Sequence, residues 1–419
     1  MASSHRPPSC RPDAPVAWLP LTETEAALPA ETDVLVIGGG VIGCALAYYL
    51  ARADVAVTLL ERGELNREAS GTNAGSFHLQ IAIHQLTGLE VDSVAGRLLP
   101  EIRLYVEGAT LWHELERELD GSVEMHVTGG LMVAETEMEL GLLHAKRRIE
   151  QEAGLETHVL EGEELRSFAP YLAHDLLGAS YCPLEGHANP LLAAPLYALR
   201  ASQSGAAIRT HAPVTAIAGP DGGGFTVQTG RGPVRAARIV NATGAWLNEV
   251  AALVGLRHPI RREGLHVNVT EPRQRLIAPL VQHIGRRLTL KQSSNDTFII
   301  GGGWPARALG AAGRYQTVWE STAGNAAVAV RVVPALAGVR LLRTWSGAIA
   351  FTEDLSPLVG ESRRVPGYFT CMATTGFTLG PLMARMLAET IATPTAASPV
   401  PDEFAPDRAP GSVPVHIVS

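Results

Sequence analysis

The chain has 419 residues, of which 46% are hydrophobic and 18% charged, and its formal net charge is −8. This composition predicts a globular protein, and the length suits two interleaved domains better than one. The sequence contains no basic stripe of the kind that binds nucleic acid, and no run of roughly 18 apolar residues that would cross a membrane. Its four cysteines are far apart in the sequence, which argues against a disulfide framework or a zinc site and favours a reducing cytoplasm.

The sequence predicts a tail at each end of the chain. Residues 1–31 include Arg and Pro but no apolar segment, so we expect a flexible N-terminal tail and not a signal peptide. Residues 393–419 are rich in Pro, Ala and Ser, and we expect them to lie over the surface or to be disordered.

A glycine-rich motif follows the N-terminal tail. Residues 33–37, DVLVI, are typical of a buried parallel strand, and residues 38–43 read GGGVIG. A helical segment at 44–52 comes next, and then an apolar strand at 55–60 that ends at Glu61. This order predicts a dinucleotide-binding βαβ unit. The alternative is a glycine-rich turn that binds no ligand.

The residue types in this motif suit a bound pyrophosphate. Gly38 allows the tight turn out of the strand, Gly40 lets the pyrophosphate approach the backbone, and Gly43 lets the helix pack close to the sheet. The free N–H groups of the helix N-terminus favour phosphate. The carboxylate of Glu61 can accept hydrogen bonds from the ribose hydroxyls. The residues expected to bind the cofactor here are Gly38, Gly40, Val41, Ile42, Gly43, Glu61 and Arg62.

Two later segments favour FAD over NAD, and an acid at the ribose position disfavours NADP. Residues 67–76, REASGTNAGS, form a loop rich in small residues, referred to below as the small-residue loop. It can pass beneath an extended cofactor, although a plain surface loop is the alternative. Residues 240–246, VNATGAW, form an apolar strand that runs into a tight turn, and the short strand before it holds Val214, which can pack on the adenine. The expected FAD contacts in these segments are Ser70, Asn73, Ala74, Gly75, Ser76, Val214, Ala242, Thr243, Gly244 and Trp246.

With these motifs in place, residues 32–391 resemble the D-amino acid oxidase superfamily of flavoproteins, which includes glycine oxidase, sarcosine oxidase and D-amino acid dehydrogenase. The resemblance rests on GGGVIGCALAYYLA, Glu61, SGTNAGS, NATGAW and the block SPLVGESRRVPGYFTCMATTGFTLGP at 356–381. It implies that a strand at 368–373 leads to a turn against the flavin ring and then to a final helix. The turn would contribute Thr375, Gly376, Phe377, Thr378 and Leu379 to the FAD site. Residues 287–306 and TNAGSFHLQ further resemble the β-subunits of D-hydroxyproline dehydrogenase and of opine oxidases.

The resemblance implies an α/β fold, with a Rossmann-like FAD-binding domain and an inserted α+β substrate domain built on an antiparallel sheet. Residues 267–270, 288–291 and 298–302 are expected to be strands of that sheet, with a hairpin turn at 293–296. The expected FAD-binding domain comprises residues 32–105, 160–250 and 340–392, and the expected substrate domain residues 106–159 and 251–339.

The sequence departs from the family pattern at two functional positions. Ile349 stands where many members carry an Arg that binds the substrate carboxylate, so another Arg must bind it or the substrate is not a simple α-amino acid. Some relatives bind flavin covalently, through a His early in the loop or a Cys near the C-terminus. In this sequence Asn73 occupies the position of that His, and Cys371 lies in an apolar strand and is expected to be a core residue. The sequence therefore predicts non-covalent FAD.

The candidate catalytic residues are His266, His78, Arg343 and Trp345. His266 can tune the protonation of an amine, or it is a histidine hydrogen-bonded within the sheet. His78 follows the small-residue loop and can line the cavity. Arg343, like Arg261 and Arg262, can pair with a carboxylate or be a solvated surface charge. Trp345 and Trp304 can form a wall of the pocket or pack in the core.

The predicted function is oxidation of the C–N bond of a small amino or imino acid (hydroxyproline-, opine- or proline-like) by hydride transfer to flavin N5. The alternatives are an O₂-using oxidase of the glycine or sarcosine type and a non-catalytic flavin-bearing subunit. The expected partners are the substrate and other subunits of a dehydrogenase complex, with no metal and no nucleic acid. The chain's two lysines bear on the electron acceptor, because sarcosine-type oxidases resembling this chain place a Lys over the flavin. Lys146 is expected on the surface and Lys291 one strand too early, which favours an acceptor other than O₂ unless an Arg or a protonated His266 takes the place of the lysine.

Overall fold

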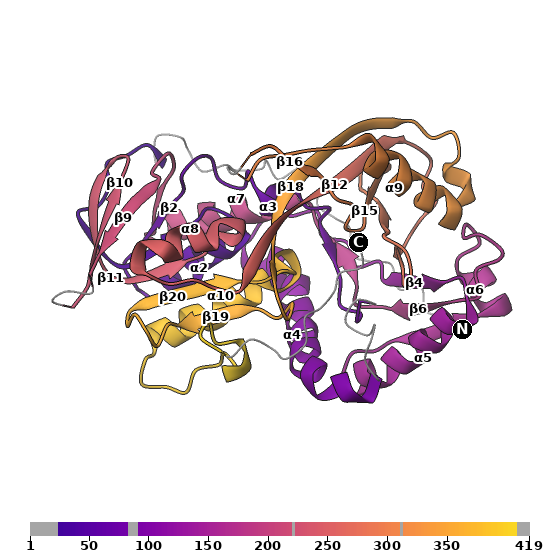
Figure 1. The fold of residues 1–419 in the computed structure, drawn as a ribbon, viewed down its shortest axis with the longest axis horizontal. Helices are drawn as coiled ribbons and strands as arrows, with labels where there is room; N and C mark the ends of the chain where they lie inside the picture. The colour runs from indigo at the N-terminus through magenta and orange to yellow at the C-terminus, as the bar shows by residue number, and fades with distance from the viewer. Residues whose placement is uncertain (1–23, 83–90, 220–222, 311–312, 409–419) are drawn as a thin grey trace.

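Two large sheets form the frame of the computed structural model, which describes residues 24–82, 91–219, 223–310 and 313–408 (Figure 1). The first sheet is mostly parallel at its centre. Its strands, in spatial order, are β19 (Leu358–Glu361), β20 (Tyr368–Met372), β11 (Gly232–Asn241), β1 (Glu31–Ile37), β2 (Val57–Leu60) and β8 (Ala207–Arg209). The hairpin of β9 (Val214–Ala218) and β10 (Phe225–Thr229) continues from β11.

The centre of this sheet is buried on both faces. The β-branched and leucine residues of β1, Val34–Ile37, are at most 5% exposed, which is the environment of a parallel strand covered by helices. Helices α7 (Pro190–Gln203) and α10 (Gly376–Ala392) both pack against α2 (Val41–Arg52), and the three share one core cluster. The first sheet and these helices make up the half of the molecule on the left of Figure 1, and their order confirms the predicted Rossmann-like architecture.

The second sheet is mainly antiparallel, as expected for a substrate domain. Its order is β18 (Leu341–Thr352), β12 (Ile260–Pro272), β15 (Thr297–Gly301), β14 (Thr289–Gln292), β13 (Leu280–His283), β4 (Gly130–Ala134), β6 (Gly178–Cys182) and β5 (His158–Glu161). Helix α9 (Trp319–Val332) lies against β12 and β15, and α5 (Glu137–Glu152) and α6 (Gly162–Phe168) lie at the other end. The turn at 293–296 joins β14 to β15, which confirms the predicted hairpin.

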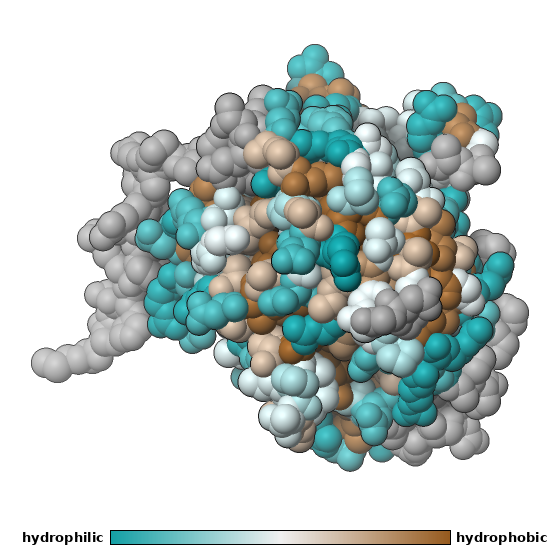
Figure 2. Space-filling view, turned by 90° about the vertical axis from the view of Figure 1, so that its left-hand side faces the viewer, coloured by the Kyte–Doolittle hydropathy of each residue, from teal (hydrophilic) through white to brown (hydrophobic). Residues whose placement is uncertain are grey.

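Short elements and one long helix connect the two halves. Helix α4 (Val91–Glu118) packs on both α10 and α5. The other elements are α3 (Ala69–Thr72), β3 (Ser76–Phe77), β7 (Gly186–His187), α8 (Leu247–Ala251), β16 (Arg307–Ala308) and β17 (Tyr315–Gln316), with short 3-10 turns at Gly244–Trp246, Ala252–Val254, Pro334–Leu336 and Asp402–Phe404. The end of the molecule formed by the first sheet carries hydrophilic and hydrophobic residues side by side, an ordinary protein surface (Figure 2). Within the described ranges, no helix combines the length and the apolar character needed to span a bilayer.

The sheets divide the chain differently from the expected domain boundaries. Strands β5 and β6 fall at 158–182 and β18 at 341–352, yet all three belong to the second sheet. Their sequences carry no mark of which sheet they join, because membership depends on pairing partners that are distant in the chain.

The described parts of both tails are fixed to the first half. The guanidinium of Arg231 donates hydrogen bonds to the carbonyls of Thr24, Glu25 and Ala26. Near the C-terminus, Arg408 donates to both carboxylate oxygens of Asp354, each at 2.9 Å. The expectation of a flexible segment is therefore wrong for residues 24–31, while residues 1–23 and 409–419 lie outside the described residues.

Lys146 corrects another expectation, since its side chain is fully buried and not on the surface. Its Nζ lies 2.7 Å from Glu150 Oε1 and also donates to Gln80 Oε1 at 2.8 Å and Ser180 Oγ at 3.3 Å. The same Glu150 oxygen accepts the backbone N–H of Ile81 at 2.8 Å. A buried charge is tolerated only when paired and hydrogen-bonded, and this pair meets both conditions.

A second buried carboxylate, that of Glu185, completes this interior polar network. Its Oε1 accepts the N–H groups of Leu79 at 2.8 Å and Gln80 at 3.1 Å. Together with Glu150, it satisfies the backbone donors of residues 79–81. The network therefore fixes the segment that directly follows His78.

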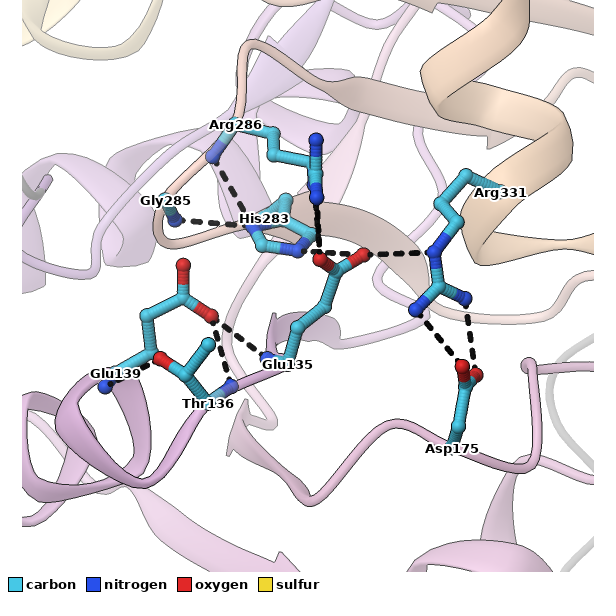
Figure 3. A network of polar contacts seen from close by, with 8 residues as sticks. All are labelled: Glu135, Thr136, Glu139, Asp175, His283, Gly285, Arg286 and Arg331. Carbon is cyan, nitrogen blue, oxygen red and sulfur yellow. Dashed lines mark hydrogen bonds and ion pairs between the residues drawn. The ribbon is translucent and has the colours of Figure 1, made fainter.

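A partly exposed ion-pair network holds the second sheet to its helices (Figure 3). Glu135, just after β4, lies 2.6 Å from Arg286 Nη2, 3.3 Å from Arg331 Nε on α9 and 3.4 Å from His283 Nε2 on β13. Arg331 also binds Asp175 through both terminal nitrogens at 2.9 Å. Although partial burial raises the pKa of Glu135, its hydrogen bond from Arg286 and the nearby cations outweigh this and keep the pKa below its ordinary value.

We predict that Lys146→Met destabilises the protein by about 3–5 kcal/mol, because it leaves the Glu150 carboxylate buried without its cation. The double variant Lys146→Met/Glu150→Gln should recover most of that loss, since it removes both charges. The midpoint of urea unfolding measures each effect. A single variant as stable as the wild type would contradict the buried pair.

Candidate cofactor and active site

The turn between β1 and α2 is shaped by the absence of side chains. Gly38 has φ +116°, a region that L-residues avoid, and a Cβ there would lie 2.6 Å from the carbonyl oxygen of Ala242. A Cβ on Gly43 would lie 1.9 Å from the Gly38 carbonyl oxygen. A Cβ on Gly40, the N-cap of α2, would lie 2.8 Å from Ser70 Oγ. The turn is thus a cradle of bare backbone at the N-terminus of a helix.

Glu61 lies directly after β2 with its carboxylate beside this cradle. Its Oε2 accepts the N–H of Gly39 and its Oε1 the N–H of Gly63, each at 2.8 Å. The next residue, Arg62, stacks on the indole of Trp246 with its guanidinium carbon 3.9 Å from the ring centroid. The structure therefore brings three predicted cofactor residues, Glu61, Arg62 and Trp246, to one edge of the sheet.

The small-residue loop folds over the start of α2. Ser70 Oγ accepts the N–H of Val41 at 2.9 Å, which joins the loop to the first turn of the helix. Asn73 holds the loop's shape, because its Nδ2 donates to the carbonyls of Ala69 and Ser70 and its Oδ1 accepts the N–H of Gly75 at 2.6 Å. The loop is thus part of the cradle and not a free surface segment.

The segment after β11 is locked by Asn241. Its Oδ1 accepts the hydroxyl of Thr243 at 2.6 Å, and its Nδ2 donates to the Leu247 carbonyl and to Tyr368 Oη. The predicted residues Ala242, Thr243 and Gly244 therefore sit next to the glycine turn, with Ala242 against Gly38. Val214 opens β9, in the hairpin that extends from β11.

The helix α10 meets α2 at their N-terminal ends. A Cβ on Gly380 would lie 2.8 Å from Ile42 Cγ1, and one on Gly376 would lie 3.7 Å from Ile42 Cδ1. On α10, the ring of Phe377 lies 4.9 Å from that of Trp112, whose Nε1 donates to the Thr378 carbonyl at 2.9 Å, and Leu379 is fully buried. Two helix N-termini, each with partial positive charge, thus converge near the cradle.

These features fit a dinucleotide. The turn at Gly38–Gly43 is bare of side chains and tightly packed, as a pyrophosphate-binding turn requires, and the N-terminus of α2 follows it directly. The carboxylate of Glu61 lies beside the turn, where it could accept hydrogen bonds from a ribose. Cys371, which the sequence analysis placed in an apolar strand, is fully buried within β20, and burial raises the pKa of its thiol.

The second sheet turns one face to the small-residue loop. Trp345 Nε1 donates to the Thr72 carbonyl at 2.7 Å, and a Cβ on Gly347 would lie 2.0 Å from Thr72 Oγ1. A Cβ on Gly301 would lie 3.9 Å from that of Ala74. Trp345 therefore lies on the face of the second sheet that covers the small-residue loop, which we call the roof. Arg343, two residues earlier on the same face, is exposed, and its guanidinium carbon lies 5.7 Å from the centroid of the Trp345 ring.

His266 points to the opposite face. Its Nε2 lies 3.1 Å from Asn268 Oδ1, and Asn268 Nδ2 donates to Asn325 and to the Thr322 carbonyl on α9. Burial lowers the pKa of His266, partly offset by its bond to Asn268. This geometry favours the interpretation of His266 as a histidine hydrogen-bonded within the sheet.

The other candidates from the sequence have partners elsewhere. Arg261 pairs with Glu263 at 2.5 Å and Arg262 with Glu249 at 2.6 Å. Trp304 donates its Nε1 to the Arg287 carbonyl. Ile349 lies on the loop-facing side of β18, in alternation with Trp345 and Gly347, and offers no charge to a carboxylate.

A cluster of imidazoles and one lysine lies against the small-residue loop. His78 is partly buried and its Nδ1 has no hydrogen-bond partner among the described residues. His187 pairs with Ser76 across β7 and β3, and its ring lies 5.0 Å from that of His126. Lys291 is 3% exposed, and a Cβ on Gly75 would lie 3.1 Å from its Nζ. Lys291, which the sequence analysis placed one strand too early to lie over the flavin, is thus beside the small-residue loop, because the alternation of residues on β14 turns Thr289 and Lys291 to the loop-facing side.

Comparison with known proteins decides the family. Residues 33–390 match the DAO family of FAD-dependent oxidoreductases. The chain belongs to this family. FAD is accordingly the cofactor of this family, and we propose the cradle as its binding site.

Among curated relatives, mouse dimethylglycine dehydrogenase is 26% identical over 390 residues, which cover 88% of this chain but 42% of the relative. The chain thus spans about two fifths of the length of that protein. An opine oxidase subunit of Rhizobium meliloti is 27% identical over 86% of this chain and 94% of its own length. The structure of L-proline dehydrogenase from P. horikoshii matches with a TM-score of 0.80 and 24% identity, over 90% of this chain and 98% of that one, and so shows the same fold.

We predict that Glu61→Ala weakens FAD binding, because it removes charge-assisted hydrogen bonds of about 1.5–3 kcal/mol each. Gly40→Val should weaken it further, since the branched side chain would occupy the cradle. Flavin content per purified protein and equilibrium dialysis measure both effects. Full flavin in Gly40→Val would contradict the assignment of the cradle.

We also predict that the FAD is not covalently bound, since Asn73 and the buried Cys371 offer no attachment site in this loop or strand. Acid precipitation should move the yellow colour into the supernatant. Flavin that stays with the denatured pellet, seen by absorbance and mass spectrometry of the chain, would overturn this expectation.

Proposed function

We propose that this protein oxidises the C–N bond of a small amino or imino acid of the hydroxyproline, opine or proline kind and passes the electrons to an acceptor other than O₂. The observation that carries the proposal is the contact between the second sheet and the small-residue loop beside the glycine turn, where Trp345 Nε1 donates to the Thr72 carbonyl at 2.7 Å. Support comes also from the relatives, which are named as dehydrogenases and oxidases of such compounds.

The cofactor supplies the hydride acceptor, and the protein supplies position and a dry site. The loop from Ser70 to Ser76 fixes the floor of the site through Asn73. The roof is fixed by Trp345, and His78 lines the side with an imidazole whose pKa is lowered to about 4 by burial and by the charge of Lys291. A neutral imidazole adds no positive charge that would repel an amine, and its unprotonated nitrogen can accept a hydrogen bond from a substrate N–H, so His78 is the residue we propose to orient the amine.

The proposed partners follow the same relatives. The chain covers nearly the whole of a protein named as a subunit, and we propose that a second subunit takes up the electrons. We also propose a reducing compartment such as the cytoplasm, because the cysteines of the described ranges, Cys44, Cys182 and Cys371, are buried free thiols.

An O₂-using oxidase is the second candidate, and one observation favours it. Reduced flavin reacts with O₂ by charge separation, which a nearby buried cation stabilises. Lys291 is such a cation beside the small-residue loop.

An anaerobic screen of amino and imino acids tests the proposal. Proline, hydroxyproline, sarcosine, dimethylglycine and an opine should include one that bleaches the visible absorbance of the flavin, whereas lactate, with C–O in place of C–N, should not. Reoxidation of the reduced protein by a dye should be faster than by O₂ at equal concentration. Faster reoxidation by O₂ would establish the oxidase, and bleaching by none of the amines would favour a non-catalytic subunit.

A further inference from the structure

The ammonium of Lys291 is a buried cation on the loop-facing side of the second sheet. It extends from β14 to within contact of Gly75, and the described residues provide it with no carboxylate and no hydrogen bond. A solitary buried ammonium is costly, because burial removes its hydration without a compensating charge. Such a group is stabilised when an anion enters beside it.

The register of the strands places Lys291 at one end of a row. Arg343 pairs with Val269, Val269 with Ile299, and Ile299 with Lys291, so these four side chains share one face across β18, β12, β15 and β14. Adjacent strands lie about 4.8 Å apart, which puts the two cations about 14 Å apart. Two apolar side chains separate them, and only Lys291 of the two cations is buried.

We propose that Lys291 binds the carboxylate of the substrate. This inference rests on the proposed function, which supplies a substrate with a carboxylate. The charge would then come from β14 and not from β18, where Ile349 offers none. Val269 and Ile299 would then face the apolar part of the substrate.

The histidines near Lys291 are neutral, so Lys291 carries the positive charge at this place. His78 approaches it from the loop and His187 from β7, while His126 and Arg275 act on His187. Burial, together with the charge of Lys291, lowers the pKa of His78 to about 4 and that of His187 to about 2, so both rings are neutral at pH 7. Each neutral ring can donate one N–H hydrogen bond to a carboxylate without adding a second positive charge to the site.

The pairing has a defined pH dependence. Burial lowers the pKa of Lys291 from 10.5 to about 7 in the free protein. An anion binds the protonated form of Lys291. Above that pH most of the lysine is unprotonated, so binding of the anion requires the lysine to take up a proton from solution. Affinity for a carboxylate should therefore be constant below about pH 7 and fall as the pH rises above it.

Titration of the FAD-loaded protein with pyrrole-2-carboxylate tests the proposal. This probe has the ring and carboxylate of an imino acid but no hydrogen on a saturated α-carbon, so it perturbs the flavin spectrum without reducing it. Pyrrole, which lacks the carboxylate, is the matched ligand control. The wild type should bind the acid at least tenfold more tightly than pyrrole at pH 6.5, and less tightly at pH 8.5.

Three variants locate the charge. Lys291→Met should lose at least tenfold in affinity for the acid and nothing for pyrrole, while Lys291→Arg should keep the affinity and lose its decline above pH 7. Arg343→Met removes the cation at the exposed end of the same row and should change the affinity less than threefold. A large loss in Arg343→Met with none in Lys291→Met would overturn the proposal and give the carboxylate to Arg343.

The readouts separate this inference from the proposed function. Should no amine bleach the flavin, the function fails, yet probe binding still reports on Lys291. Should amines bleach it while the wild type shows equal affinity for pyrrole and its acid, or no pH dependence, the function stands and the inference is wrong. The wild-type comparison needs no variant, so it decides the matter even if Lys291→Met does not fold.

Discussion

The close contact between α2 and the end of β1 is the constraint on which the site depends. With no side chain on Gly43, the helix can approach to a distance at which a Cβ would overlap the Gly38 carbonyl oxygen. That approach fixes where the helix N-terminus points, and two other segments are built against it. The small-residue loop binds Val41 through Ser70, and α10 packs its Gly380 on Ile42. One tight contact thus sets the relative positions of three segments that are far apart in the sequence.

The parts of the fold that the sequence predicted are those in which local pattern and structure coincide. The turn at 38–43, the hairpin at 293–296 and the final helix each carry their own signal in neighbouring residues. The side to which His266 points could not be predicted in this way. It depends on the pairing of β12 with β15 and β18, and a shift of one residue would reverse it.

The two lysines show the same limit. In the helix α5, Lys146 follows Leu140 and Leu143 at the spacing of the buried face, so the pattern held a signal that its charge obscured. Its partner Gln80 is distant in the sequence, and nothing local indicates that the interior would supply it. The buried polar network also has a direct bearing on the candidate site, because Glu150 and Glu185 take up the backbone donors that follow His78.

The paired strands β12 and β18 belong to both halves of the molecule (Figure 1). At one end these strands hold Trp345 against the small-residue loop. At the other end they join a hydrophobic cluster with the first half, made up of Ala348, Ala350, Ala245, Leu247, Leu358 and Met372. A continuous two-stranded ribbon of this kind resists bending, since bending would break its ladder of backbone hydrogen bonds. Movement of the second sheet away from the small-residue loop would therefore have to bend this ribbon and break the hydrogen bond between Trp345 and Thr72.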